Sequence, residues 1–171
     1  MSARKMLVVV IDKTKVVVGA AARRMAGVPA VADLVGPGLL LRMKGEDSWV
    51  QVPADELIVK EVDYRDDVVR QPLGHVLDAT GSVVTPTLQV TQLNATSSEV
   101  TVKVFPVPQV EKTVLVLIDG GPGQPPVKLV GKTAAGVDTT KFAVSGLPSG
   151  EHLIIATVDA HAPLMAVGSF F

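Results

Sequence analysis

The sequence contains no cysteine, which excludes disulfide bonds and thiolate metal sites. Aromatic residues are also scarce, at 4% of the chain, so an aromatic platform for bases or sugars has few candidates. The apolar runs are short, as in Met6–Ile11, and none approaches the roughly 18–20 residues that cross a bilayer. That first run is also shorter than the core of a signal peptide, which has about 7–15 residues. We therefore expect no membrane segment and no secretion signal.

Neither positive nor negative charge predominates in the sequence. The net charge is −1, and basic and acidic residues are interspersed along the whole chain. A nucleic-acid-binding surface needs a concentration of Lys and Arg, so we expect no nucleic-acid partner. All arginines lie at or before Arg70, and this step in composition suggests a domain boundary soon after that residue.

Catalytic and cofactor-binding motifs are missing from the sequence. It has neither of the glycine-rich loops that cradle phosphates, G-x-x-x-x-G-K-[ST] and G-x-G-x-x-G. The loop Asp119-Gly120-Gly121-Pro122-Gly123 resembles the oxyanion loop of some α/β-hydrolases, but Asp119 stands where that family has His. The nucleophile elbow of that family, G-x-S-x-G, is absent. We interpret the loop as a plain Pro/Gly connection and expect neither an enzyme nor a cofactor.

Metal-ligating residues are present but badly spaced. His75, His152 and His161 have no helical or hairpin spacing that would bring them to one metal ion. The carboxylates occur in adjacent pairs, which lack the alternating pattern of a calcium loop. We interpret these pairs as solvated turns or a helix cap. They are Glu46-Asp47, Asp55-Glu56 and Asp66-Asp67.

What the sequence does have is valine. Hydrophobic residues make up 47% of the chain, they are mostly aliphatic, and the branched Cβ of Val favours a pleated sheet over a helix. The sequence therefore predicts a mainly β fold. A small protein exposes much of its surface, so a composition this apolar also suggests that part of the surface is buried against other subunits.

Residues 1–85 predict an N-terminal domain that is α+β or β-rich, with one short helix. Two strands, 5–11 and 15–18, precede an alanine-rich stretch over 20–35 that predicts the helix, interrupted at Gly27 and Pro29. A hairpin follows, with strands 39–43 and 48–52, and then a further strand over 56–64.

Residues 86–171 have a different texture, with short strands punctuated by turns every eight to twelve residues, as in all-β sandwiches. The stretch KFAVSGLPSGEHLIIATVDA has a strand, a corner at Gly146–Gly150 in which Leu147 would plug the core, and a second strand beginning near His152. This pattern resembles an immunoglobulin-like (Ig-like) β-sandwich of the kind found in bacteriophage virion and bacterial surface proteins. Such domains often have Tyr where His152 stands, and the Cys–Trp–Cys triad of antibody domains is absent.

Four residues are candidates for an interface. Arg23 and Arg24 form the best basic patch, which could contact phosphate or an acidic partner. Trp49 and Tyr64 belong to the residue types that often anchor interfaces, although both could equally fill the core of the first domain.

These observations favour a structural virion protein, most concretely a bacteriophage capsid decoration or tail accessory protein, made in the host cytoplasm and located in the virion. Its expected partners are other copies of itself, for example in a trimer, and a major capsid or tail protein. Residues 1–85 would dock or oligomerise, and the sandwich would project outward. The alternative is a non-catalytic carbohydrate- or protein-binding module of a bacterial surface system.

Overall fold

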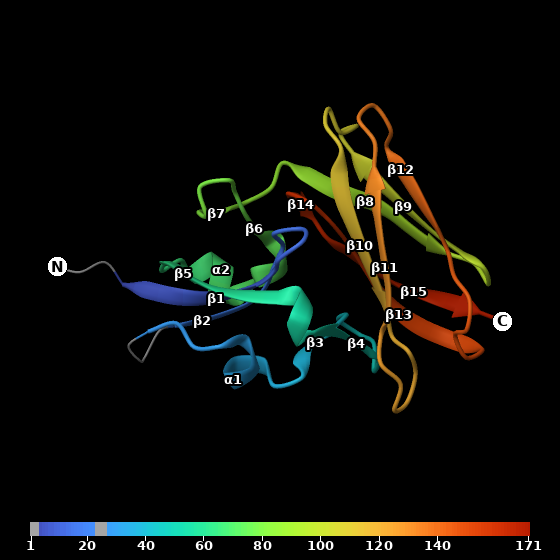
Figure 1. The fold of residues 1–171 in the computed structure, drawn as a ribbon, viewed down its shortest axis with the longest axis horizontal. Helices are drawn as coiled ribbons and strands as arrows, with labels where there is room; N and C mark the ends of the chain where they lie inside the picture. The colour runs from blue at the N-terminus through green and yellow to red at the C-terminus, as the bar shows by residue number, and fades with distance from the viewer. Residues whose placement is uncertain (1–3, 23–26) are drawn as a thin grey trace.

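The computed structural model describes residues 4–22 and 27–171, and the fold is mainly β, as the sequence predicts (Figure 1). The N-terminal part contains strands β1–β7, two α-helices and two 3-10 helices. Their bounds are β1 Lys5–Ile11, β2 Val17–Ala22, α1 Val31–Val35, β3 Gly38–Arg42, β4 Trp49–Pro53, η1 Ala54–Glu56, β5 Leu57–Asp63, α2 Asp66–Arg70, η2 Pro72–Gly74, β6 Val76–Leu77 and β7 Val83–Val84.

The C-terminal part is a sandwich of two four-stranded sheets. Its strands are β8 Leu88–Ala95, β9 Glu99–Phe105, β10 Lys112–Ile118, β11 Val127–Thr133, β12 Thr139–Ala143, β13 Gly150–Val158, β14 His161–Ala162 and β15 Leu164–Phe170. One sheet has the order β11-β10-β13-β15 and the other the order β12-β9-β8-β14. All pairs in them are antiparallel except β14 with β8. The sheets meet closely at one edge, where a Cβ on Gly168 would lie 2.6 Å from the Cβ of Ala95.

The N-terminal part is built on a smaller sheet with the order β2-β1-β5. The β3–β4 hairpin lies between this sheet and the sandwich (Figure 1). The hairpin pairs Arg42 with Trp49 and Leu40 with Gln51, which confirms the predicted strands and their turn. The predicted strand over 56–64 is confirmed as β5.

Three strands are apolar on both faces because each lies between two cores. In β1, Met6, Val8 and Val10 pack with one buried cluster, whereas Val9 and Ile11 pack with another. Strands β10 and β13 alternate in the same way between the interior of the sandwich and its outer face. A strand buried on both faces needs a nearly continuous apolar run, which explains the sequences VLVLI and LIIATV.

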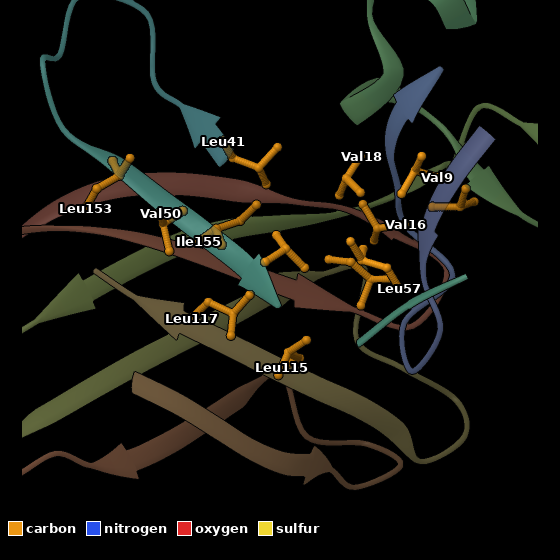
Figure 2. Packing of buried hydrophobic residues seen from close by; sticks show 13 residues of the cluster. Val9, Val16, Val18, Leu41, Val50, Leu57, Leu115, Leu117, Leu153 and Ile155 are labelled. Atoms are coloured by element: carbon orange, nitrogen blue, oxygen red, sulfur yellow. The ribbon is translucent and has the colours of Figure 1, made fainter. Parts of the chain in front are cut away.

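The cluster on the outer face of the sandwich joins the two parts of the chain (Figure 2). Leu115, Leu117, Leu153 and Ile155 of the sandwich meet side chains of the N-terminal part there. These are Val9, Ile11, Val16, Val18, Leu41, Val50, Val52, Leu57 and Val76. The N-terminal part therefore covers the sheet face that the sandwich would otherwise expose. The domain boundary near residue 85 stays a prediction, but the two parts share this core.

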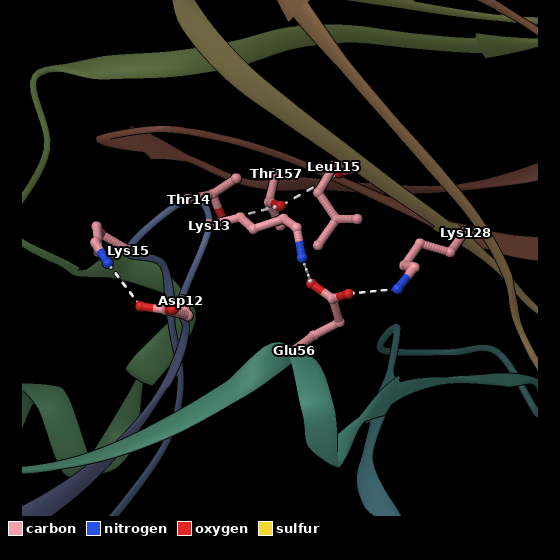
Figure 3. A network of polar contacts seen from close by, with 8 residues as sticks. All are labelled: Asp12, Lys13, Thr14, Lys15, Glu56, Leu115, Lys128 and Thr157. Atoms are coloured by element: carbon pink, nitrogen blue, oxygen red, sulfur yellow. Dashed lines mark hydrogen bonds and ion pairs between the residues drawn. The ribbon is translucent and has the colours of Figure 1, made fainter.

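A polar network also crosses the junction (Figure 3). The Glu56 carboxylate is 2% exposed and accepts hydrogen bonds from Lys13 Nζ at 2.6 Å and from Lys128 Nζ at 2.5 Å. Burial raises the pKa of Glu56, but the two lysines outweigh burial and the net shift is downward. Beside this network, Thr14 Oγ1 donates to Thr157 Oγ1 at 3.1 Å, and Thr157 donates to the Leu115 carbonyl at 3.2 Å.

Two helical features differ from the sequence prediction. The helix expected to begin near Ala20 is wrong at its start, because Ala20–Ala22 extend β2 and pair with Met6–Val8 of β1. Pairing along the largely buried strand β1 outweighs the helical propensity of alanine here. Residues 23–26 of the predicted stretch lie outside the described residues, and among the rest of the stretch the α-helix is the five-residue α1. After Tyr64, α2 is a further short helix that the sequence did not indicate.

Candidate binding surfaces

Trp49 is held on a rigid strand with its side chain directed outward. Successive residues of a strand point to opposite faces, so the burial of Val50 and Val52 fixes Trp49 and Gln51 on the outer face of β4. The indole is 55% exposed, and Leu40, opposite Gln51 on β3, is exposed beside it. The candidate role of Trp49 in the first core is therefore wrong, whereas its role at an interface stays a prediction.

The loop between β10 and β11 forms the facing wall. Asp119 begins it and is fixed twice: its N–H donates to the Leu153 carbonyl at 2.9 Å, and its Oδ1 accepts from the Gly121 N–H at 3.1 Å. Gly120 is required for the tight path, since a Cβ there would lie 2.0 Å from the Pro125 carbonyl oxygen. In the loop that resembles a hydrolase oxyanion loop, the Gly121 N–H therefore points to the Asp119 side chain of the same loop.

Between the hairpin and this loop lies a groove of about 360 Å³, which we call the Trp49 groove. Its walls carry carboxylates, amides, a hydroxyl, proline rings and the indole. The lining residues are Leu40, Asp47, Ser48, Trp49, Gln51, Asp119, Gly121, Pro122, Gly123, Gln124 and Pro126. Arg42 lies outside this lining and donates to Asp47 Oδ1 at 3.1 Å. Trp49 and the Gly/Pro loop are separate features in the sequence, and only the fold brings them together.

A second surface lies at the opposite end of the sandwich, which is the upper end in Figure 1. Four large apolar side chains are exposed there: Phe105 at 63%, which ends β9, and on the two loops Val110 at 59%, Val107 and Val137. The loops are joined by a 2.8 Å hydrogen bond from the Gly136 N–H to the Pro108 carbonyl. We call these four residues the apolar end. The apolar end was not predicted from the sequence, although the run FPVPQV, which has a single polar residue, is a signal for it.

Tyr64 is only partly exposed and has structural contacts. Its ring packs against the core beneath β1, and the Arg4 guanidinium lies 4.0 Å from the ring centroid in a cation–π contact. Its hydroxyl donates to Asp66 Oδ1 at 3.4 Å. Tyr64 is therefore far less accessible than Trp49. The other two candidates, Arg23 and Arg24, lie outside the described residues.

The three histidines are buried separately from one another. The ring nitrogens of His152 lie 2.6 Å and 2.8 Å from the carbonyl oxygens of Asp119 and Pro148. His75 contacts the Gln71 carbonyl and Asp67 Oδ2, and His161 Nδ1 lies 2.6 Å from the Asp159 carbonyl. Burial lowers the pKa of His161. Residues 4–22 and 27–171 contain no group of three or more His, Asp or Glu placed to hold a metal ion.

Comparisons with known proteins add no family. No known family model matches the chain, and a comparison with curated proteins finds no match. Among the residues that the structure describes, no helix is long and apolar enough to cross a membrane.

Proposed function

We propose that the chain is a non-catalytic structural protein of a bacteriophage particle, a capsid decoration or tail accessory protein. The observation that carries this proposal is the apolar end. Phe105, at the end of β9, and Val107, Val110 and Val137, on two loops that hydrogen-bond to each other, are all exposed at this end. Large apolar side chains exposed at one end of a domain are typical of sites of protein–protein contact. The contact would be with a major capsid or tail protein, and the protein would be located in the virion.

Strand order supports an Ig-like assignment of the sandwich. If β8, β9, β10, β11, β12, β13 and β15 are lettered A, B, C, C′, E, F and G, leaving out strand D and the two-residue β14, one sheet reads C′-C-F-G and the other contains E-B-A. Ig-like sandwiches divide their strands between two sheets in this way. The same architecture is common on exposed protein surfaces, where its loops carry the contacts.

The corner before β13 also supports this assignment. Ig domains have a Tyr near the start of strand F whose hydroxyl bonds to the backbone a few residues upstream. His152 occupies the corresponding place in β13 and contacts the Pro148 carbonyl four residues upstream. The ring also meets Phe170 edge-on, with centroids 5.6 Å apart, so it closes the end of the core.

The shared core suits a protein that makes contacts through both of its parts, because it holds the two parts in a fixed arrangement. Because Leu117 and Ile155 pack against the N-terminal part, the sandwich and residues 1–85 are held to each other by buried apolar side chains. The sequence favours residues 1–85 as the docking or oligomerisation part, and the apolar end adds a second contact surface. Copies related by symmetry, for example in a trimer, would bury further apolar surface between them.

Particle association tests the proposal. Virions purified from the strain whose genome encodes the chain are banded on a density gradient, and the fractions are probed with an antibody. We expect the chain in the particle band. With Phe105→Asp and Val110→Asp combined, we expect it at the top of the gradient, because two charges would be buried in the contact.

The matched control is Val130→Asp, which adds a charge at an exposed valine of β11 outside the apolar end. This variant should remain in the particle band. Thermal unfolding of all variants checks that each is folded. Wild-type protein found only at the top of the gradient would overturn the proposal.

The Trp49 groove favours a second candidate, the binding module of a bacterial surface system. A half-exposed indole beside free amides suits ligand binding better than burial in a protein contact. The same gradient separates the two candidates, because a cell-surface module would not band with virions.

A further inference from the structure

We infer that the Trp49 groove binds a neutral glycan chain. The inference extends the proposed function by giving the protein a ligand, and it rests on a binding role rather than on the virion location. The groove and the apolar end lie at opposite ends of β10, so a glycan and a docking partner can be held at the same time.

The apolar contribution comes from Trp49. Its indole is exposed, yet the strand that carries it is fixed by the buried Val50 and Val52, so little backbone freedom is lost on binding. The face of an aromatic ring carries a negative quadrupole. The C–H groups on one face of a pyranose ring are weakly positive and flat enough to stack on it, which makes a sugar ring a suitable occupant.

The polar contribution comes from side chains that have no partner of their own. Among residues 4–22 and 27–171, neither the Ser48 hydroxyl nor the amides of Gln51 and Gln124 are in a hydrogen bond within the protein. An amide supplies both donors and acceptors, and so does a sugar hydroxyl. Gln51 projects from the same face of β4 as Trp49, so stacking and hydrogen bonding can act on one sugar ring.

Two carboxylates are the remaining polar groups of the groove, and they disfavour an anionic ligand. Asp47 and Asp119 each have one oxygen held, by Arg42 and by the Gly121 N–H, which leaves a second oxygen to accept from a hydroxyl. No Lys, Arg or His lines the groove within the described part of the chain. Sulfated, phosphorylated or uronic-acid polymers would therefore be repelled, and a neutral glycan is favoured.

The size of the groove sets how much of a glycan it holds. A volume of about 360 Å³ is near the lower end of ligand pockets, which span roughly 300–1,000 Å³. The groove therefore accommodates a short stretch of a chain, and we expect affinity on the order of 0.1–1 mM for a single site. Several copies on one particle would raise the overall avidity without new contacts.

The test uses the fluorescence of Trp49, which is the only tryptophan of the chain and reports directly on the groove. Maltohexaose, cellohexaose and chitohexaose are titrated as neutral probes. A sulfated heparin hexasaccharide, decalysine and decaproline represent anionic, cationic and peptide ligands. We expect a saturable change with at least one neutral hexasaccharide and protection of the indole from acrylamide quenching.

Variants measured by calorimetry assign the contacts. Trp49→Ala should weaken binding of the neutral hexasaccharide at least tenfold, and Gln51→Ala about fivefold. The matched control is Phe105→Ala, which truncates an exposed aromatic residue at the other end of the sandwich and should bind as the wild type does. Unfolding midpoints of the variants exclude loss of fold as the cause.

Each other outcome overturns the inference. The inference would be refuted if no neutral hexasaccharide changed the fluorescence at 10 mM, a concentration roughly ten times the highest dissociation constant expected. Tighter binding of heparin, decalysine or decaproline, or equal weakening by Phe105→Ala, would refute it as well. The virion proposal is judged on the gradient alone, so failure of one experiment is not failure of the other.

Discussion

Replacing Ile155 with alanine should destabilise the whole molecule, although Ile155 lies on the outer face of the sandwich. The side chain is fully buried in the cluster that joins the two parts of the chain. Alanine lacks about three CH₂ equivalents of isoleucine, and at roughly 0.8 kcal/mol each their burial contributes about 2.4 kcal/mol. The cavity left behind adds to this loss, so we expect the free energy of unfolding to fall by about 3–4 kcal/mol.

The neighbouring residue supplies a matched comparison. Ile154 has the same side chain, is also fully buried, and faces the interior of the sandwich. Ile154→Ala should therefore cost about the same, roughly 3–4 kcal/mol. Val130→Ala, at an exposed position of β11, should cost less than about 0.5 kcal/mol.

Urea unfolding followed by far-ultraviolet circular dichroism and by Trp49 fluorescence measures all three changes. Trp49 reports on the N-terminal part and circular dichroism on all strands, so coincident transitions indicate that both parts unfold together. An Ile155→Ala cost below about 1 kcal/mol, with Ile154→Ala at full cost, would refute the shared core. Separate transitions of the two signals would refute it as well.

Three further perturbations test other contacts. Glu56→Gln should lower the free energy of unfolding, measured by urea titration, by about 1–2 kcal/mol. This is less than the cost of breaking a fully buried ion pair, because Lys128 is partly exposed. An unchanged free energy of unfolding would show that the ion pairs of Glu56 do not stabilise the fold. Burial lowers the pKa of His161 in the folded state, so the unfolded state binds more protons and stability falls as pH drops below about 6.5. Melting curves of His161→Leu from pH 7.5 to 5 should show a smaller decrease than wild type, and parallel curves would argue against this cause. Deleting residues 164–171 should lower the melting temperature by more than 10 °C, because it removes strand β15 and the buried Phe170; an unchanged midpoint would exclude this role.

Much of the sandwich could be predicted because its strands carry local signals. The alternation of Val100, Val102 and Val104 predicts β9 with one face buried, and the structure has β9 at Glu99–Phe105. The corner at Gly146–Gly150 is also readable, since Gly146 adopts a positive φ of 79° and Leu147 packs against the core. Turns and strands of this kind depend on neighbouring residues.

The sequence does not indicate which residues cover the outer face of the central strands of the sandwich. A run such as VLVLI in β10 predicts burial on both faces but does not identify what covers the outer one. The cover comes from residues of the N-terminal part that lie far earlier in the chain, from Val9 to Val76 and including Leu57 and Ile11. For the same reason Ala20–Ala22 were expected in a helix, because their pairing with β1 is a long-range contact.

The candidate surfaces show a similar limit. Trp49 was identified from residue type alone, yet its exposure follows from the phase of β4, which is fixed by Val50 and Val52. The groove requires the 119–126 loop to lie beside the hairpin, and nothing local to either segment indicates that. Phe105 was assigned to a strand correctly, but its exposure at the apolar end depends on where the strand terminates.

Counting copies in purified virions tests the central claim most directly. Quantitative mass spectrometry gives the ratio of this chain to the major capsid protein and to the tail proteins in the same preparation. A structural component should occur at a fixed ratio to one of them, set by the symmetry of the particle and unchanged by a high-salt wash. Absence of the chain, or a ratio that falls with each wash, would contradict the account.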